Sequence, residues 1–113
     1  MPKSIRNEYS LDNIVKTIQK HISDRTVELT IHAQDEMIED NVSVSELLTA
    51  LKHGIVVENY PEYERGACCL VCGKGHERFL HIVCTTTLPE LVIITVYEPL
   101  PPKWPTPFER GLK

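Results

Sequence analysis

Arg78-Phe79-Leu80-His81-Ile82-Val83-Cys84-Thr85 and Leu91-Val92-Ile93-Ile94-Thr95-Val96-Tyr97-Glu98 are the two stretches that decide the fold of this chain. Both are rich in β-branched residues, and the short loop Thr86-Thr87-Leu88-Pro89-Glu90 separates them. Two such runs joined by about five residues are typical of an antiparallel β-hairpin. The pattern therefore predicts a hairpin in which Thr85 pairs with Leu91.

Strand alternation divides this predicted hairpin into two faces. One face is apolar and is expected to pack on helices, with Arg78 opposite Glu98 at its end. Its apolar members are Leu80, Ile82, Cys84, Val92, Ile94 and Val96. The other face mixes apolar side chains with titratable and hydroxyl groups, which makes it the candidate for a site. Its members are Phe79, His81, Val83, Thr85, Leu91, Ile93, Thr95 and Tyr97.

The first half of the chain has helical periodicity. Apolar residues spaced by three and four predict a helix over residues 11–22. Thr30 is placed to cap a second helix that runs to about residue 40. Ser43-Val44-Ser45-Glu46 is a capping box, which predicts a third helix through His53. The segment 27–31 is either an extended stretch or the lead-in to the second helix.

The second half changes to the period of β-strands. Strands are predicted at residues 55–60 and 67–72, followed by a turn through Gly73-Lys74-Gly75 and then the hairpin. Five prolines after Glu98 prevent further pairing, and Trp104 is expected to pin this tail to the body. The layout predicts an α+β fold, with N-terminal helices packed on one face of an antiparallel sheet of about four strands.

Length and composition indicate one folded domain. The chain has 113 residues, of which 42% are hydrophobic and 25% charged, as in ordinary globular domains. Residues 1–9 are predicted to be a loose leader, and residues 99–113 a proline-rich tail. No apolar run approaches the roughly 20 residues that span a membrane, and no signal-peptide core is present. We therefore expect a cytoplasmic protein without a membrane partner.

Charge is unevenly distributed along the chain. Residues 1–64 carry six basic and twelve acidic residues, and residues 65–113 carry six basic and four acidic residues. The two parts have net charges of −6 and +2, which together give −4. Nucleic-acid binders present a basic footprint, so any such footprint must lie on the C-terminal sheet.

Four cysteines raise the question of a metal site. Cys69 and Cys72 form a Cys-x-x-Cys pair, and Cys68, Cys84, His76 and His81 are the other candidate ligands nearby. Positions i and i+3 of a strand point to opposite faces, so this pair is poorly placed to share one metal ion. We expect buried thiols and no metal or other cofactor. A metal-binding or redox role of the cysteines is the alternative.

Several motifs follow one another in an order that resembles a known family. They are His32-Ala33 with Met37, Gly54, Tyr60-Pro61, Arg78, His81-Ile82-Val83, the run from Ile93 to Pro99, and Trp104. Over residues 30–104 this order resembles the domain-of-unknown-function family numbered 4258, which is similar to the RelE/ParE-like and BrnT-like toxins of bacterial toxin–antitoxin pairs. The resemblance implies a compact α+β fold, metal-independent cleavage of messenger RNA, and neutralisation by a small antitoxin protein.

The chain departs from the family at two positions. The helix of the family usually carries arginines where this chain has Glu36 and Asp40, whereas Glu39 matches. Two cationic positions are thus anionic here. If they lay near a scissile phosphate, they would repel a polyanionic substrate.

Four residues are the candidates for the implied ribonuclease chemistry. Such cleavage needs a base, an acid and a cation for the charge of the phosphorane. His81 is the candidate acid–base group, and Arg78 the candidate phosphate clamp. Tyr97 would donate a proton or stack a base, and His32 would be the second acid–base group.

Each candidate also has a structural interpretation. His81 fits a hydrogen-bonded sheet histidine, and Arg78 fits a cross-strand ion pair with Glu98. Tyr97 fits a packing role, and His32 fits a cap of its helix. The hypotheses are therefore a toxin-like ribonuclease or its degenerate relative, a non-catalytic protein-binding module, and a metal-binding protein. The oligomeric state does not follow from the sequence.

Overall fold

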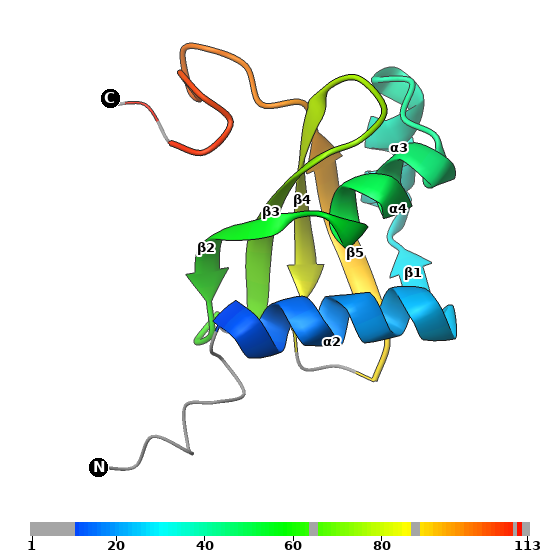
Figure 1. The fold of residues 1–113 in the computed structure, drawn as a ribbon. Coiled ribbons are helices and arrows are strands. Elements are labelled where there is room, and N and C mark those ends of the chain that lie inside the picture. Colours follow the sequence, from blue (N-terminus) through cyan, green and yellow to red (C-terminus); the bar gives the residue numbers. More distant parts are fainter. Residues whose placement is uncertain (1–10, 64–65, 87–88, 110, 112–113) are drawn as a thin grey trace, which may run out of the picture.

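The computed structural model describes residues 11–63, 66–86, 89–109 and 111, so the predicted leader at residues 1–9 lies outside the described part. Three helices and five strands succeed one another within it (Figure 1). They are α2 (Leu11–Asp24), β1 (Val27–Leu29), α3 (Ile31–Glu39), α4 (Val44–Lys52), β2 (Ile55–Tyr60), β3 (Cys68–Lys74), β4 (Phe79–Thr85) and β5 (Leu91–Tyr97). Among the described helices, none is long and apolar enough to cross a membrane.

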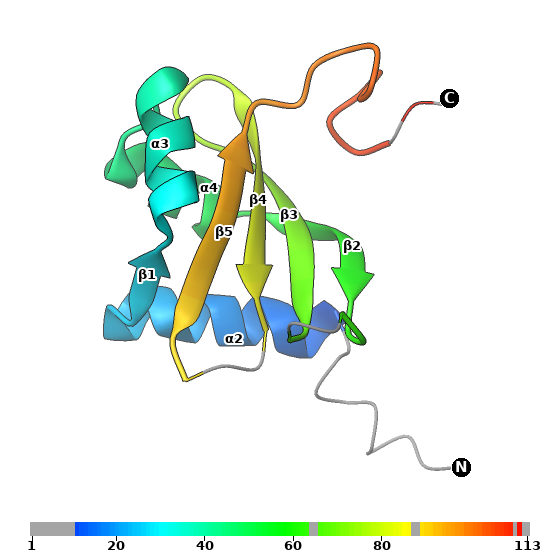
Figure 2. The same cartoon turned by 180° about the vertical axis from the view of Figure 1, so that it is seen from behind.

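The strands form one sheet in the order β1-β5-β4-β3-β2. Strands β2 to β5 pair antiparallel, and β1 pairs parallel to β5. The helices cover one face of this sheet, so that the strands lie in front when the molecule is seen from behind (Figure 2). The predicted α+β class is confirmed, with five strands instead of about four. The added strand is β1. Of the open segment 27–31, residues 27–29 are therefore extended, whereas Thr30 caps α3 and Ile31 begins it.

Two predicted caps define the helix starts. The Thr30 hydroxyl accepts a hydrogen bond from the main-chain nitrogen of Ala33 at 3.0 Å. The Ser43 hydroxyl accepts one from the nitrogen of Glu46, also at 3.0 Å. A side chain that accepts from the first turn satisfies a donor that the helix itself cannot pair. The predicted helices are thus confirmed, although α2 runs two residues further than expected, to Asp24.

The predicted turn at Gly73-Lys74-Gly75 is wrong at its start, because β3 continues through Lys74. A Cβ atom on Gly73 would overlap the carbonyl oxygen of Ala50 in α4. Glycine at this position therefore lets α4 approach the strand closely, and it does not serve to reverse the chain.

The hairpin forms, but its register contains a β-bulge that the sequence analysis missed. Ile82 pairs with Val96 and Cys84 with Ile93, and the shift falls between Val83 and Cys84. The predicted pairing of Thr85 with Leu91 therefore does not fit this register. An inserted residue exchanges the two faces of a strand beyond it.

The bulge changes which residues of β5 enter the core. Leu91 and Ile93 are 1% and 0% exposed and belong to the core under the helices, whereas Val92 and Ile94 are only half-buried. The prediction that Val92 and Ile94 pack on the helices is wrong for this reason. Leu80, Ile82, Cys84 and Val96 do lie in that core, as predicted.

Helix α3 covers the part of β5 that short β1 leaves unpaired. Strand β1 pairs only as far as Ile93. Beyond it, the Thr30 hydroxyl donates to the carbonyl oxygen of Ile94 at 3.2 Å, and a Glu36 carboxylate oxygen accepts from the nitrogen of Val96 at 2.8 Å. A sheet edge that is covered by a helix does not pair with foreign strands. Glu36 thus has a structural role on the sheet edge.

Candidate functional site

His81 and Tyr97 lie side by side on the outer face of the sheet, the face opposite the helices. Their Cα atoms are paired across β4 and β5, and His81 Nδ1 is 3.0 Å from the Tyr97 hydroxyl oxygen. Their rings meet at a centroid distance of 5.1 Å and an interplanar angle of 63°. The structure thus brings together two of the four predicted site residues.

The segment after β5 covers this pair. The Trp104 ring packs edge-to-face on the imidazole of His81 at a centroid distance of 4.3 Å, and Phe108 packs in the same way on Phe79 at 5.3 Å. His81 Nε2 lies 2.6 Å from the carbonyl oxygen of Pro107. His81 is 0% exposed and Trp104 2%. The expected pinning of the tail by Trp104 is confirmed, and it closes the outer face over His81.

The bonding partners fix the proton positions on the His81 ring. A carbonyl oxygen can only accept, so Nε2 carries a proton and donates it to Pro107. In the neutral imidazole, Nδ1 then accepts the O–H of Tyr97. Both ring nitrogens are therefore engaged in structural hydrogen bonds, which is the arrangement of a buried sheet histidine.

Arg78 lies on the helix side and not beside His81. Its Nε and Nη2 atoms donate to the two carboxylate oxygens of Glu46, each at 3.1 Å. Nη2 also donates to the carbonyl oxygens of Asp40 and Asn41, at 2.9 and 3.2 Å. Nη1 lies 3.6 Å from a carboxylate oxygen of Glu98, so the expected cross-strand pair is present. Arg78 thus joins β4 to α4 and to the turn before it.

Glu46 is the partner of Arg78 that the sequence analysis missed. It is 6% exposed and also accepts from the nitrogen of His76 at 3.4 Å. The hydrogen bonds from Arg78 lower the pKa of the Glu46 carboxyl, and they do so against its burial, which acts to raise it. Its spacing from Ser43 indicated a helix cap, and no local pattern links it to residue 78.

His32 lies on α3, apart from the other candidates. Its side chain is 66% exposed, and its Nε2 atom is 3.3 Å from a Glu36 carboxylate oxygen one helical turn further on. Together with the Glu36 bond to Val96, this pair fixes α3 against the edge of β5. The four predicted catalytic residues therefore occupy three separate places: the outer face, the helix side and α3.

The cysteines lie where the strand argument places them. Cys69 belongs to the core under the helices, whereas Cys72 is paired with His81. All four cysteines are buried and unbridged, with the sulfurs of Cys69 and Cys84 3.9 Å apart. Burial raises the pKa of the Cys72 thiol to about 11. Over the described ranges, no three His, Cys, Asp or Glu side chains gather in the way a metal site needs.

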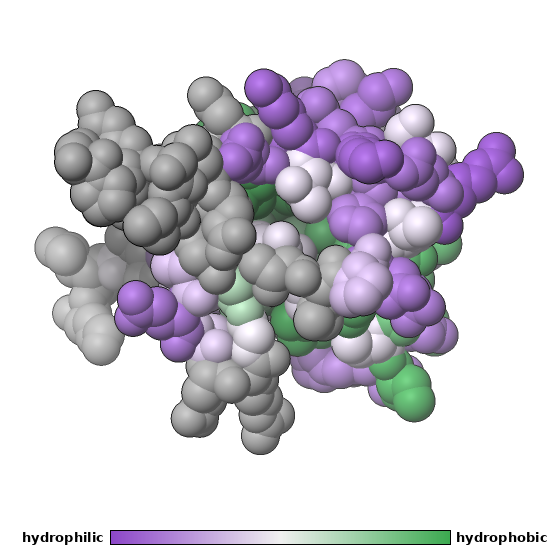
Figure 3. All heavy atoms as spheres, turned by 90° about the horizontal axis from the view of Figure 1, so that it is seen from below, coloured by the Kyte–Doolittle hydropathy of each residue, from purple (hydrophilic) through white to green (hydrophobic). Residues whose placement is uncertain are grey.

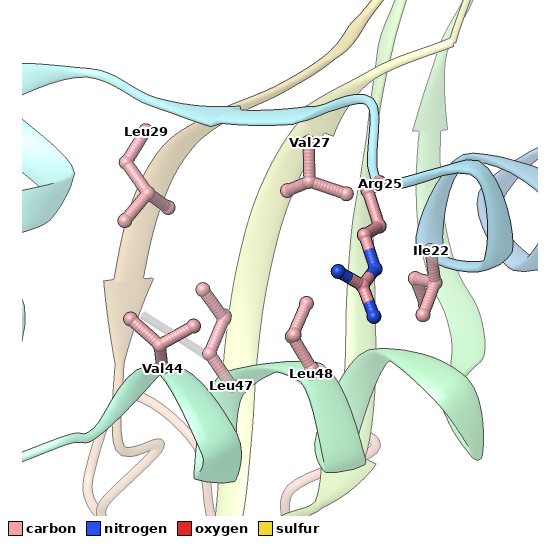
Figure 4. A pocket seen from close by; sticks show the side chains of 7 residues that line it. All are labelled: Ile22, Arg25, Val27, Leu29, Val44, Leu47 and Leu48. Carbon is pink, nitrogen blue, oxygen red and sulfur yellow. The ribbon is translucent and has the colours of Figure 1, made fainter.

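An open groove lies between β1 and α4. Its volume is about 400 Å³. Its lining residues are Ile22, Arg25, Val27, Leu29, Val44, Leu47 and Leu48. Val27 and Leu29 point from the strand toward the helix, and the guanidinium of Arg25 points into the space beside Ile22 and Leu48 (Figure 4). Six of the seven residues that line this β1–α4 groove are apolar, and Arg25 is the charged one.

A second hollow continues from this groove. Its volume is about 500 Å³, and its lining residues are Gln19, Ile22, Ser23, Lys52 and His53. Ile22 borders both hollows. Seen from below, hydrophilic residues cover much of the coloured surface, and hydrophobic residues are visible in the hollow between them and at the lower right edge (Figure 3). The two hollows meet at Ile22 and form one channel, which is apolar along the β1–α4 groove and mainly polar along the second hollow, with Arg25 in the first part and Lys52 in the second.

The groove was not predicted from the sequence. On α4, Leu48 is only half-buried, and Val44, at the start of the helix, is 53% exposed. Part of the information was in the sequence, because an extended stretch was one of the two alternatives for residues 27–31. Only the placement of β1 beside α4 turns these residues into one surface.

Comparison with known proteins gives one family. The family model described as Domain of unknown function (DUF4258) matches residues 29–98, which contain Leu29 at the end of β1 and all later helices and strands. No curated protein and no solved structure shows a significant match to the chain. The matched part includes the apolar wall of α4, the Arg78–Glu46 pair, and both His81 and Tyr97. The chain belongs to the DUF4258 family.

Proposed function

We propose that this chain is a non-catalytic protein-binding module, and that its β1–α4 groove takes an apolar segment of a protein partner that is flanked by carboxylates. If the resemblance to toxins of toxin–antitoxin pairs holds, the chain would be a relative of those toxins that binds a protein but no longer cleaves RNA. The groove is the observation that carries this proposal.

The chemistry of the groove supports this occupant. Apolar walls such as Val44 and Leu48 lose contact with water when an apolar side chain fills the space between them, which is favourable at roughly 25 cal/mol per Å². Arg25 and Lys52 supply positive charge along the channel. A carboxylate next to the apolar residues of the partner would pair with these cations and set its orientation.

The state of the catalytic candidates also supports binding over catalysis. His81 has both ring nitrogens engaged and is 0% exposed, so a substrate has no access to it in this conformation. The guanidinium of Arg78 is bound by Glu46 and by two carbonyl oxygens, which leaves it poorly placed to clamp a phosphate. A small antitoxin of the kind that the toxin resemblance implies would be one protein able to present the required segment.

The experiment places a photo-crosslinking amino acid at position 48 in the cell and, as a control, at position 63 on the outer face, where Tyr63 is 53% exposed. We expect a protein to be captured from position 48 and not from position 63. Once identified and purified, that protein should bind the wild type and Tyr63→Glu, and should lose binding to Leu48→Glu. Capture at equal yield from both positions, or binding that survives Leu48→Glu, would contradict the proposal.

A ribonuclease is the second candidate, because His81 and Tyr97 are two acid–base groups 3.0 Å apart. In that case the tail would have to move before RNA could reach them. Trp104→Ala removes the ring that covers His81 and should then increase cleavage of messenger RNA by the purified protein, while the double variant with His81→Ala should be inactive. If RNA stays intact with the wild type and with Trp104→Ala, this candidate fails.

A further inference from the structure

Helix α3 has an exposed face that nothing in the described structure covers. Ile31 and Ile38 are 77% and 78% exposed, and they are seven positions apart, so they lie on the same side of the helix. Exposed acidic residues, Asp35 and Glu39, stand between and beside them. Two fully exposed isoleucines on one helix of nine residues are more than the scattered apolar residues of an ordinary surface.

The exposed face of α3 is complementary to the β1–α4 groove, because both have apolar residues and they carry opposite charges. The groove is apolar and carries Arg25, with Lys52 in the adjoining hollow, while the exposed face of α3 has two isoleucines and carries Asp35 and Glu39. Within one molecule the two surfaces cannot meet, because α3 packs on the edge of β5 through Glu36. Between two molecules they are complementary in both polarity and charge.

The two surfaces also lie at the same end of the molecule. Helices α3 and α4 and strand β1 gather on one side in the front view and in the view from behind (Figures 1 and 2). When a surface and its complement are neighbours, a two-fold axis can satisfy both contacts at once and close the assembly as a dimer. Surfaces on opposite ends would instead produce an open chain of molecules.

We propose that the partner in the β1–α4 groove is a second copy of this chain, which inserts the Ile31–Ile38 face of its α3 while receiving the same face in return. This inference rests on the proposed function, because it names the occupant of the same groove. Asp35 and Glu39 of one protomer then pair with Arg25 and Lys52 of the other. Each contact joins one face of a nine-residue helix to one groove, so we expect a weak dimer with a Kd of about 1–100 μM.

Sedimentation analysis of the purified full chain tests this directly. The weight-average mass should rise from 12.9 kDa toward twice that value as the concentration increases through the micromolar range. Ile38→Glu should remain monomeric over the same range, and its high exposure means that it should fold. Leu100→Glu is the matched control, since Leu100 is also an exposed apolar residue, at 57%, and should dimerise as the wild type does.

Charge reversal tests which surfaces meet. The double variant Arg25→Glu with Lys52→Glu and the double variant Asp35→Lys with Glu39→Lys should each lose self-association. A mixture of the two should recover it, because one of its contacts has the native charges and the other has both charges reversed. If mixing does not restore the dimer, α3 is not the segment in the groove.

The outcomes separate this inference from the proposed function. A chain that stays monomeric at every concentration, while position 48 captures a different protein, would overturn the second copy as occupant and leave the groove as a binding site. A monomeric chain with no groove-specific capture would overturn both. Dimers that Ile38→Glu and Leu100→Glu affect equally would overturn the assignment to α3.

Discussion

Arg78 and Glu46 tie the hairpin to the helix layer through one buried ion pair. The Glu46 side chain is 8% exposed and the Arg78 side chain 27%. Without Glu46, the half-buried Arg78 guanidinium would keep only Glu98 and two carbonyl oxygens as partners, so the cost is that of the lost charged hydrogen bonds. A single side chain at the start of α4 therefore sets the position of the β3–β4 turn, whose residue His76 it also binds.

Glu46→Gln should lower the free energy of unfolding at pH 7 by roughly 1–3 kcal/mol, the range for a hydrogen bond to a charged group. The pKa of Glu46 is lowered in the folded state because Arg78 donates hydrogen bonds to the carboxylate. The unfolded chain takes up this proton near pH 4.3, so the stabilisation is complete above that pH and is lost as the pH falls through the lower folded value.

Urea unfolding at pH 7 and pH 3 measures this effect, and the difference between wild type and Glu46→Gln should shrink at pH 3. The control is Asp24→Asn, which breaks the exposed pair with Lys20 and should leave stability unchanged. An equal loss at both pH values would show that the carboxylate charge has no part in the effect.

Glu36 offers a second test with a matched pair of variants. Its carboxylate oxygen accepts from the nitrogen of Val96, so Glu36→Ala should leave a donor on the β5 edge unpaired and cost about 1–3 kcal/mol. Glu36→Gln keeps an acceptor oxygen at the same reach and should cost less than half as much. Thermal unfolding of the two variants decides this, and equal destabilisation would remove the edge-capping role.

The bulge in β5 shows where strand patterns lose predictive power. The bounds of β2 agree with the expected 55–60, and the caps at Thr30 and Ser43 agree as well, because spacing and capping are local properties. A one-residue insertion leaves no such local mark in Leu91–Tyr97, since nearly every residue there is apolar or β-branched. In β5 the face of Val96, which follows the bulge, was therefore predicted correctly, and the faces of residues 91–94 were exchanged.

Paired alanine substitutions in β5 test this register. Ile93→Ala should destabilise the protein by about 2–4 kcal/mol, because Ile93 is 0% exposed in the helix-side core. Ile94→Ala should cost clearly less, since Ile94 is half-buried on the outer face. Chemical unfolding of both variants is the measurement. The regular register without a bulge predicts the reverse order.

Within the candidate site, only the contact between residues on neighbouring strands could be predicted from the sequence. His81 and Tyr97 were expected on one face of the hairpin, and they meet there because β4 and β5 pair directly. The contacts of His32 and Arg78 depend on how α3 and α4 pack, and the cover by Trp104 depends on the path of the tail. Those are long-range contacts, for which sequence spacing gives no rule.

Because the cysteines are buried and the tail covers the outer face, we predict that thiol reagents label them slowly. Burial raises the pKa of Cys72 to about 11, so only about one thiol in a thousand is ionised at pH 8 and able to react. The native protein should therefore react slowly with a thiol reagent at pH 8. Trp104→Ala should speed labelling of Cys72 on the outer face, while Cys69 and Cys84 in the helix-side core stay protected.

Mass spectrometry of the labelled peptides identifies the reactive positions. If Trp104→Ala labels all four cysteines at one common rate, the tail stabilises the entire fold and does not act as a local cover. If the variant labels no faster than wild type, Trp104 does not shield this face.

The chain thus has two sides with different properties. The outer face is closed by the tail over its titratable residues, whereas the helix side ends in an open apolar groove beside β1. The protein-binding role that we propose rests on the open side of this division. Membership of the DUF4258 family gives the domain of this chain, and its activity follows from a measurement on its own site.

Methyl spectra of the protein with labelled isoleucine, leucine and valine test the groove most directly. They should be recorded at rising protein concentration and with the captured partner. We predict shifts at the groove methyls of Val27, Leu29, Val44, Leu47 and Leu48. Val83 and Ile94, on the outer face, should not move. Shifts that centre on Val83 and Ile94, or that appear with RNA and not with protein, would contradict the account.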